Sequence, residues 1–242
     1  IGVARDLKAF LNFHEKANLN IQLPKVELPA SSDETIKIKI EDTDGCPRYS
    51  GAVITGVKVQ ESPDWLKNRL RAIGLNPINN IVDITNYVMH ETSNPLHAFD
   101  LKDVNGEIIV KRALEGEKIV TLDEVERELN QEDLMICNST ENMCIAGTFG
   151  GLHSGVKSNT TDIFLEAAYF NQVSVRKTAK RHGLNTDSSF RFERGVDPNA
   201  VKTALARAVY LLEEITGATL VESKDNYRNP LQDFNVSFNF QR

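Results

Sequence analysis

The chain has 242 residues, 40% of them hydrophobic, which is enough for one large globular domain or two small ones. Its net charge of −6 argues against a protein that binds nucleic acid over its whole surface. No run of about 18 apolar residues is present, and the first residues lack the order of a signal peptide, so we expect a cytoplasmic protein with no membrane partner. Because the chain begins at Ile1 rather than Met, we also expect it to be a piece of a longer protein.

The common cofactor and metal patterns are missing from the sequence. It contains no GxxxxGK[ST], GxGxxG, GxSxG or HExxH, and its five histidines are scattered. The three cysteines show no CxxC spacing and indicate reduced, structural thiols. We therefore expect no metal and no nucleotide cofactor in this chain.

The first predicted elements are a helix and a linker. Residues 3–16 have helical spacing, and residues 20–35 contain two prolines, a Ser-Ser pair and no periodicity, which is typical of a linker. We expect the compact unit to start near Thr35. Alternation of side chains then predicts strands over residues 36–40 and 49–60.

A helix is predicted after these strands. Ser62 supplies a capping hydroxyl, Pro63 suits the first turn, and the amphipathic residues 64–73 end at Gly74. By composition the next segment, residues 78–92, could be helix or strand, but its three- and four-residue apolar spacing favours a helix. Strands linked by polar turns are then predicted over residues 107–114, 133–138, 143–147 and 162–170.

Two helices are predicted towards the end of the chain. One spans residues 172–182 and is closed by Gly183. The longer one spans residues 198–216, with Asp197 as its cap and Gly217 as its stop. Strands thus cluster in the middle with helices around them and no regular βαβ alternation, which predicts an α+β fold rather than a doubly wound sheet.

One carboxylate interrupts the apolar strand FLEAAYF. Side chains alternate along a strand, so Glu166 shares a face with Phe164, Ala168 and Phe170. That face could be solvated, or Glu166 could pair with a neighbouring cation. Alternatively, Glu166 is held in a pocket to meet a polar group of a ligand, because an unpaired buried charge is costly.

Three other features allow both a structural and a functional interpretation. His97 lies between apolar neighbours, as a structural histidine often does. The glycines of residues 147–155 could form turns alone or let a ligand approach the backbone closely. The basic run at residues 176–181 could be a solvated helix face or a phosphate contact.

Five segments in order carry a resemblance to a known family. They are GLNPINNIVDITNYV, PLHAFD, GTFGG, FLEAAYF and RHGLNTDSSFRFERGVDP. Together they make the chain resemble the B3/B4 domain in the β subunit of bacterial phenylalanyl-tRNA synthetase. The ends of the chain resemble parts of the neighbouring domains. The resemblance implies a division into residues 1–38, 39–228 and 229–242.

The resemblance implies a fold and an activity. The fold is a β-sandwich-like core of mostly antiparallel strands with flanking helices, and the activity is hydrolysis of tyrosine wrongly attached to tRNA(Phe). A hydrophobic pocket rejects an added hydroxyl only about 100-fold, whereas a site that hydrogen-bonds the hydroxyl discriminates by roughly 10⁴ to 10⁵. The resemblance implies that Glu166 is the group that binds the phenolic hydroxyl.

Three catalytic positions carry over from the family. Asn86, with Thr85 beside it, and His97 match polar residues near the aminoacyl ester and its amino group. Their implied roles are to position the ester and to hold the attacking water, helped by a ribose hydroxyl of the tRNA. No side-chain nucleophile is implied.

Two wall positions of the pocket also match the family, and two other places depart from its usual pattern. Gly150 matches a position whose missing side chain leaves room for the ring, and Thr186 matches another wall residue. Ser188 stands where the family usually has alanine, and Thr148-Phe149 stands where it usually has Val-Met. Both departures alter the pocket wall and thus bear on its volume.

The resemblance also implies partners of a larger enzyme. These are the acceptor end of tRNA(Phe), tyrosine and phenylalanine, and an α subunit in an α2β2 heterotetramer, with ATP and Mg²⁺ serving the whole synthetase. Arg176, Lys180 and Arg181 are expected to face the tRNA. Two alternatives are a tRNA-binding scaffold without editing activity and a free-standing domain for another aminoacyl ester. Glu166, His97, Asn86 and Thr186 together favour editing over the scaffold, and the flanking segments argue against the free-standing domain.

Overall fold

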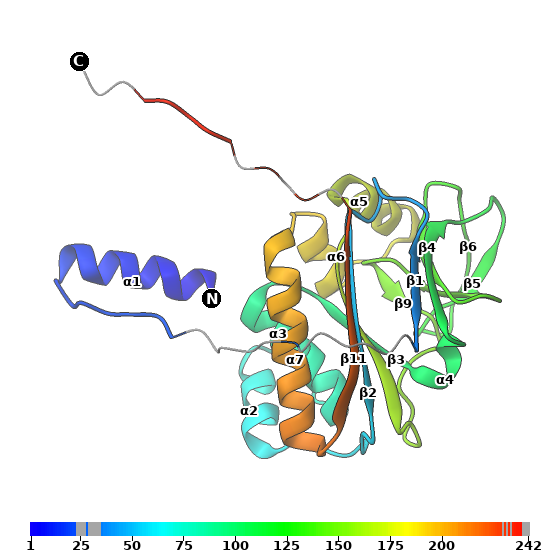
Figure 1. Ribbon diagram of the computed structural model, residues 1–242, viewed down its shortest axis with the longest axis horizontal. Helices are drawn as coiled ribbons and strands as arrows, with labels where there is room; N and C mark the ends of the chain where they lie inside the picture. The colour runs from blue at the N-terminus through cyan, green and yellow to red at the C-terminus, as the bar shows by residue number, and fades with distance from the viewer. Residues whose placement is uncertain (23–27, 29–34, 229, 231, 233, 239–242) are drawn as a thin grey trace.

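The computed structural model describes residues 1–22, 28, 35–228, 230, 232 and 234–238. Two β-sheets face each other, and a layer of helices covers the outer side of one of them (Figure 1). Most of the linker predicted over residues 20–35 lies outside the described residues, as does part of residues 229–242.

The first sheet is antiparallel and has four strands. Their order is β11 (Thr219–Tyr227), β2 (Arg48–Thr55), β10 (Asp162–Tyr169) and β3 (Leu96–Asp100). The two central strands, β2 and β10, are buried along nearly their whole length. Buried β-branched and aromatic side chains on both faces explain why these segments form central strands.

The second sheet has five shorter strands. Their order is β1 (Lys37–Ile40), β4 (Glu107–Arg112), β7 (Leu134–Cys137), β8 (Asn142–Ile145) and β9 (Phe149–Gly150). Strands β1 and β4 are parallel, and the other pairs are antiparallel. A hairpin of β5 (Lys118–Val120) and β6 (Glu126–Glu128) extends beside this sheet. The prediction of mostly antiparallel strands is confirmed.

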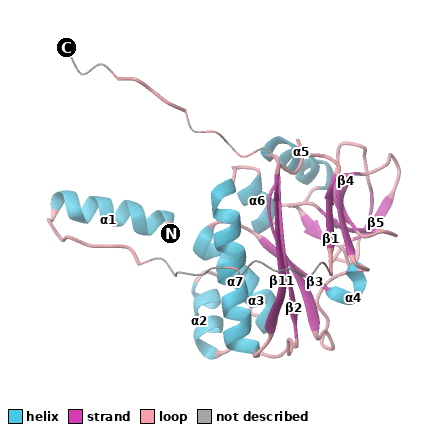
Figure 2. Cartoon of the chain, viewed as in Figure 1, coloured by secondary structure: helices cyan, strands magenta, loops and turns pink. Residues whose placement is uncertain are grey.

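Most of the helices lie beside the sheets, whereas α1 lies apart from them, as Figure 2 shows. They are α1 (Gly2–His14), α2 (Asp64–Ala72), α3 (Asn80–Thr92), α4 (Leu101–Val104), α5 (Gln172–His182), α6 (Asp187–Phe192), the 3₁₀ helix η1 (Pro198–Ala200) and α7 (Val201–Thr216). Capping explains several of the bounds. Asn79 accepts hydrogen bonds from Ile81 and Val82 at the start of α3, and Gly183 ends α5 in a left-handed conformation.

The apolar interior has two main layers that share the four-stranded sheet. Between the sheets lie Tyr49, Val53, Phe99, Phe164 and Phe170 with side chains from the second sheet. On the other face, Ala52, Ile54, Ala98, Leu165 and Ala167 pack against α2, α3 and α7. The alternation of β10 therefore sends Leu165 to the helices and Glu166 to the space between the sheets.

Most predicted elements are confirmed, and two details are wrong. The strand predicted over residues 49–60 ends at Thr55, where Gly56 follows with a positive φ, and residues 56–60 are not strand. Ser62 does not cap α2: the cap position is Pro63, and the Ser62 hydroxyl donates to Asp83 Oδ2 at 2.5 Å. The ambiguous segment 78–92 forms helix α3. Two strands that line up beside β2 and β10, namely β11 and β3, had no predicted counterpart.

Candidate functional site

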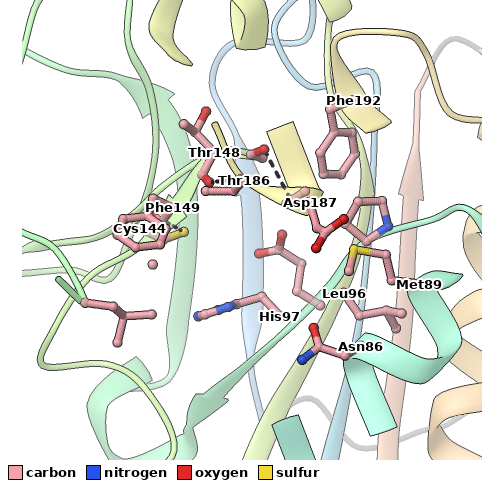
Figure 3. A pocket seen from close by; sticks show the side chains of 16 residues that line it. Asn86, Met89, Leu96, His97, Cys144, Thr148, Phe149, Thr186, Asp187 and Phe192 are labelled. Atoms are coloured by element: carbon pink, nitrogen blue, oxygen red, sulfur yellow. Dashed lines mark hydrogen bonds between the residues drawn. The ribbon is translucent and has the colours of Figure 1, made fainter. Parts of the chain in front are cut away.

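A cavity of about 220 Å³ lies where edge strand β3 and strand β10 meet strands β8 and β9 of the second sheet, beside α3 and α6. This is far more than the 10–15 Å³ or so that one water needs. Figure 3 shows His97 and Asn86 along one side of it, with Thr148 and Thr186 on the opposite side. Six of the predicted site residues line this cavity: Asn86, His97, Gly150, Glu166, Thr186 and Ser188.

Glu166 reaches the cavity from the middle of β10. It lies opposite His97 on β3 and opposite Gly51 on β2, and it is only 5% exposed. The interpretation as a solvated surface carboxylate is therefore excluded. No lysine or arginine of the described residues forms an ion pair with it; instead the Tyr49 hydroxyl donates to its Oε2 at 2.7 Å.

These buried surroundings determine whether the Glu166 carboxyl is protonated. Burial raises the pKa of its carboxyl to about 8, and the hydrogen bond from Tyr49 opposes this only in part. Near neutral pH the carboxyl is therefore mostly protonated. In that form it can donate a hydrogen bond as well as accept one.

His97 presents a second polar group to the cavity. Its ring packs edge-on against Phe99, with ring centroids 4.4 Å apart, and burial lowers its pKa to about 4. The imidazole is therefore neutral at pH 7. Its Nε2 is buried and has no hydrogen-bond partner among the described residues. Such an unsatisfied buried atom is costly, so it marks a place for a ligand or a water.

Gly150 keeps the space between the sheets open. A Cβ built at this position would lie 2.9 Å from Leu122 Cδ1 and 3.0 Å from His97 Cε1. Leu122 follows strand β5, and its amide donates to the Gly150 carbonyl at 3.0 Å. Any side chain at residue 150 would push on both neighbours and on the cavity between them.

Helix α6 forms the wall with the two hydroxyl residues. Thr186 caps the helix, and its hydroxyl donates to the Thr148 carbonyl at 2.9 Å. The Ser188 hydroxyl donates to the Gly147 carbonyl at 3.2 Å. Both hydroxyls are thus bonded to the loop before β9. The hydroxyl added by Ser188 binds the protein rather than standing free in the cavity.

Thr85 and Asn86, which were predicted together as site residues, point to different sides of helix α3. The amide side chain of Asn86 lines the cavity (Figure 3), whereas Thr85 does not. Thr85 is 7% exposed, and its hydroxyl donates to the Val82 carbonyl one helical turn back, at 2.7 Å. Consecutive helical residues point about 100° apart, which is why only one of them faces the cavity.

The predicted RNA-binding cations on α5 lie away from the cavity. None of Arg176, Lys180 and Arg181 lines it. Arg181 forms ion pairs with Glu132, at 2.7 Å, and with the buried Asp133. Arg176 and Lys180 are exposed.

Several residues of the cavity wall were not singled out from the sequence. Met89, Leu122 and Cys144 line it, as does Asp187, whose carboxylate pairs with Arg191 at 2.8 Å. Tyr49, behind the wall, also escaped notice. Alternation places Tyr49 and Gly51 on one face of β2, but only the strand register shows which side chain they meet.

The chemistry of the cavity excludes one kind of nucleophile. Cys144 is a buried thiol, and burial raises its pKa well above the ordinary value. Thiolate is the nucleophilic form of cysteine, so this thiol is inert at neutral pH. Within the described part of the chain, no group of three His, Cys, Asp or Glu side chains is arranged to hold a metal ion. Nor is any helix there long and apolar enough to cross a membrane.

Two facing sheets with a helical cover and a cavity between them define the class of this domain. The chain belongs to the B3/4 domain family, which matches residues 45–217. Over its whole length it is 55% identical to a segment of the phenylalanine–tRNA ligase beta subunit of Porphyromonas gingivalis and 52% identical to that of Bacteroides fragilis. It spans 30% of the length of each of these relatives.

Two further proteins are similar to this chain. The phenylalanine–tRNA ligase beta subunit of Aquifex aeolicus is 49% identical over 94% of the chain and 28% of its own length. A crystal structure of an N-terminal fragment of the Pyrococcus horikoshii phenylalanyl-tRNA synthetase beta subunit has a TM-score of 0.54. It covers 90% of this chain and 57% of its own, at 17% identity, and so supports the fold.

Proposed function

We propose that this domain is the editing site of a phenylalanyl-tRNA synthetase and hydrolyses tyrosine wrongly attached to tRNA(Phe). The observation that carries the proposal is the buried carboxyl of Glu166 in the wall of the cavity, with no cation beside it. A buried polar group with spare hydrogen-bonding capacity selects a ligand that supplies a partner for it.

The cavity suits the phenol ring of tyrosine. Glu166 uses Oε2 to accept from Tyr49, and among the described residues no hydrogen bond occupies Oε1. A tyrosine hydroxyl can pair with Oε1 whether the carboxyl is neutral or ionised, because a hydroxyl both donates and accepts. Phenylalanine would leave Oε1 unpaired. Apolar walls such as Phe192 and Leu96 suit the ring in both cases.

The reaction requires an activated water rather than a protein nucleophile. The water oxygen adds to the ester carbonyl, the bond to the ribose oxygen breaks, and that oxygen leaves with a proton as free tyrosine is released. His97 is neutral and offers the unpartnered Nε2 to orient the water or the ester. Asn86 supplies an amide for the ester or the amino group, and a ribose hydroxyl of the tRNA assists the attack.

The remaining partners of the proposal are those that the family resemblance implies. The longer protein would bind the acceptor end of tRNA(Phe) and an α subunit in an α2β2 heterotetramer. ATP and Mg²⁺ would serve its aminoacylation site, outside this chain. Thr186 and Gly150 act as walls of the editing pocket, while Thr85 supports α3 through its backbone hydrogen bond.

The decisive test measures release of amino acid from preformed Tyr-tRNA(Phe) and Phe-tRNA(Phe) by the full synthetase that contains this chain. We expect Glu166→Ala, which removes every hydrogen-bonding group at this position, to lower the preference for tyrosine by at least about 100-fold while aminoacylation persists. Glu166→Gln should lower it less, because an amide can still pair with a hydroxyl. Glu222→Gln is a matched control, because Glu222 is also buried but lies on β11, away from the cavity.

Two results would redirect the proposal. Unchanged selectivity in both Glu166 variants would remove the role of Glu166 in binding the hydroxyl. If the unmodified enzyme released no tyrosine, the domain would instead be a tRNA-binding scaffold without editing activity.

A further inference from the structure

We propose that Tyr49 is a positioning residue for the editing site: its hydroxyl fixes the Glu166 carboxyl so that Oε1 is the oxygen presented to the tyrosine hydroxyl of the substrate. This inference rests on the proposed function. It assigns a specificity role to a residue that does not itself line the cavity.

The strand register brings the two side chains together. Glu166 lies opposite Gly51, and Tyr49 is two residues before Gly51 on the same face of β2. Tyr49 is therefore a diagonal cross-strand neighbour of Glu166, within reach of a long side chain. Gly51 is essential to this arrangement, because a Cβ there would lie 2.1 Å from Phe164 Cζ.

The direction of the hydrogen bond is fixed by chemistry. Tyr49 is fully buried, and burial, followed by the nearby Glu166, raises the pKa of its phenol well above the ordinary value. The phenol therefore stays protonated and donates to Oε2 at 2.7 Å. A neutral carboxyl then carries its own proton on Oε1, facing the ligand, and an ionised carboxyl presents Oε1 as an acceptor.

Other groups near Glu166 do not replace this bond. His97 on β3 is neutral because burial lowers its pKa to about 4. The thiols of Cys46 and Cys144 are kept neutral because burial raises their pKa. Asp187 on α6 is paired with Arg191. Tyr49 is thus the group that directly stabilises the ionised form of Glu166, and its removal should raise the pKa of the carboxyl.

The test uses Tyr49→Phe in the full synthetase, since phenylalanine keeps the ring and removes only the hydroxyl. We expect the tyrosine-over-phenylalanine preference in deacylation to fall by up to about tenfold, the effect of losing one hydrogen bond between neutral buried groups. Because a hydroxyl binds an ionised carboxyl more strongly than a neutral one, the pH profile of kcat/KM for tyrosine release reports the titration of Glu166 in the free enzyme. Its midpoint should move to higher pH.

Replacing Tyr49 by 3-fluorotyrosine gives a second variant that keeps the hydroxyl. Fluorine makes the phenol a stronger donor, so the midpoint should move in the opposite direction, to lower pH. An unchanged midpoint in both variants overturns the proposal. Val53→Ala is the packing control: Val53 lies on the same face of β2 but has no bond to Glu166, so it should change stability without moving the midpoint.

Glu166→Ala in the same assay separates the two proposals. If Glu166→Ala loses selectivity and Tyr49→Phe behaves as the unmodified enzyme, the positioning role of Tyr49 fails and the editing function stands. If Glu166→Ala also keeps full selectivity, the role of Glu166 in binding the hydroxyl has failed as well.

Discussion

The two faces of the four-stranded sheet differ in what interrupts their apolar packing. On the helix-covered face, Ile163, Leu165 and Ala167 of β10 belong to a cluster of buried apolar side chains. On the face between the sheets, the same strand carries Glu166 between Phe164 and Ala168. One strand thus fills an apolar layer with one set of alternate residues and places a polar side chain in a cavity wall with the other.

Residues of the neighbouring strands, and not of β10 alone, surround Glu166. Tyr49 bonds Glu166 from β2, and His97 lies opposite it on β3. Gly150, on β9 of the second sheet, faces His97. Changes on the face between the sheets should therefore alter substrate release, and changes on the helix-covered face should alter stability.

The largest effect is expected when the space between the sheets is filled. Gly150→Leu would press on Leu122 and His97 and occupy the cavity, so release of tyrosine from Tyr-tRNA(Phe) should fall to the background rate. The measurement is deacylation by the full enzyme, with aminoacylation as the check on folding. Gly155→Ala is a matched control, because its Cβ would lie 3.7 Å from Leu122 Cδ2, an ordinary contact. Normal tyrosine release by Gly150→Leu would contradict the placement.

The next effect tests the helix-covered face. Leu165 is fully buried against the helices, so Leu165→Ala should lower the free energy of unfolding by about 2–5 kcal/mol. Denaturant unfolding measures this change. In the fraction that remains folded, the preference for tyrosine over phenylalanine should be unchanged. A change of selectivity equal to that of Glu166→Gln would show that the two faces are not separable.

The smallest effect is a pH dependence of stability. Glu166 has a raised pKa, near 8, so its contribution to stability is lost as pH rises through that value. His97 has a lowered pKa, near 4, so its contribution is lost as pH falls, and the two slopes oppose each other below about pH 6.5. Of these two groups, only Glu166 contributes a slope between about pH 6.5 and 8, where the free energy of unfolding should fall by up to about 1.4 kcal/mol per pH unit.

Glu166→Gln should remove this slope. Unfolding curves of the unmodified and variant proteins at pH 6.5, 7 and 8 would show it. Glu222→Gln serves again as the control, because interactions with Thr35 and Lys224 hold the pKa of Glu222 below its ordinary value. An equal slope in the Glu166→Gln protein would mean that the carboxyl is already ionised at neutral pH.

Local sequence signals located most elements but not their neighbours. Helix α5 has the predicted bounds, because its periodicity ends at a glycine that adopts a left-handed conformation. Strand β3 escaped prediction because Pro95 and His97 disturb its alternation, and β11 because its sequence TLVESKDNY is largely polar. Both are edge strands of their sheet, where one side of the strand is unpaired and polar side chains are tolerated.

The candidate site was likewise predictable only in part from the sequence. Resemblance supplied Glu166, His97, Asn86, Gly150, Thr186 and Ser188, which the cavity brings together. Tyr49 could not be found this way, because its link to Glu166 spans 117 positions and depends on the register of β2 and β10. Thr85 was grouped with Asn86 because they are adjacent in sequence, whereas a helix turns neighbours to different sides.

The ion pairs of α5 reduce the number of its cations that are available to a polyanion. The helix carries four cations, Arg176, Lys177, Lys180 and Arg181, and two of them, Lys177 and Arg181, are already neutralised by Glu132 and Asp133. Each phosphate contact releases condensed counterions in proportion to the cations that are available. An RNA that bound at this helix would thus show the ionic-strength dependence of a site with two cations, about half of what the sequence suggests.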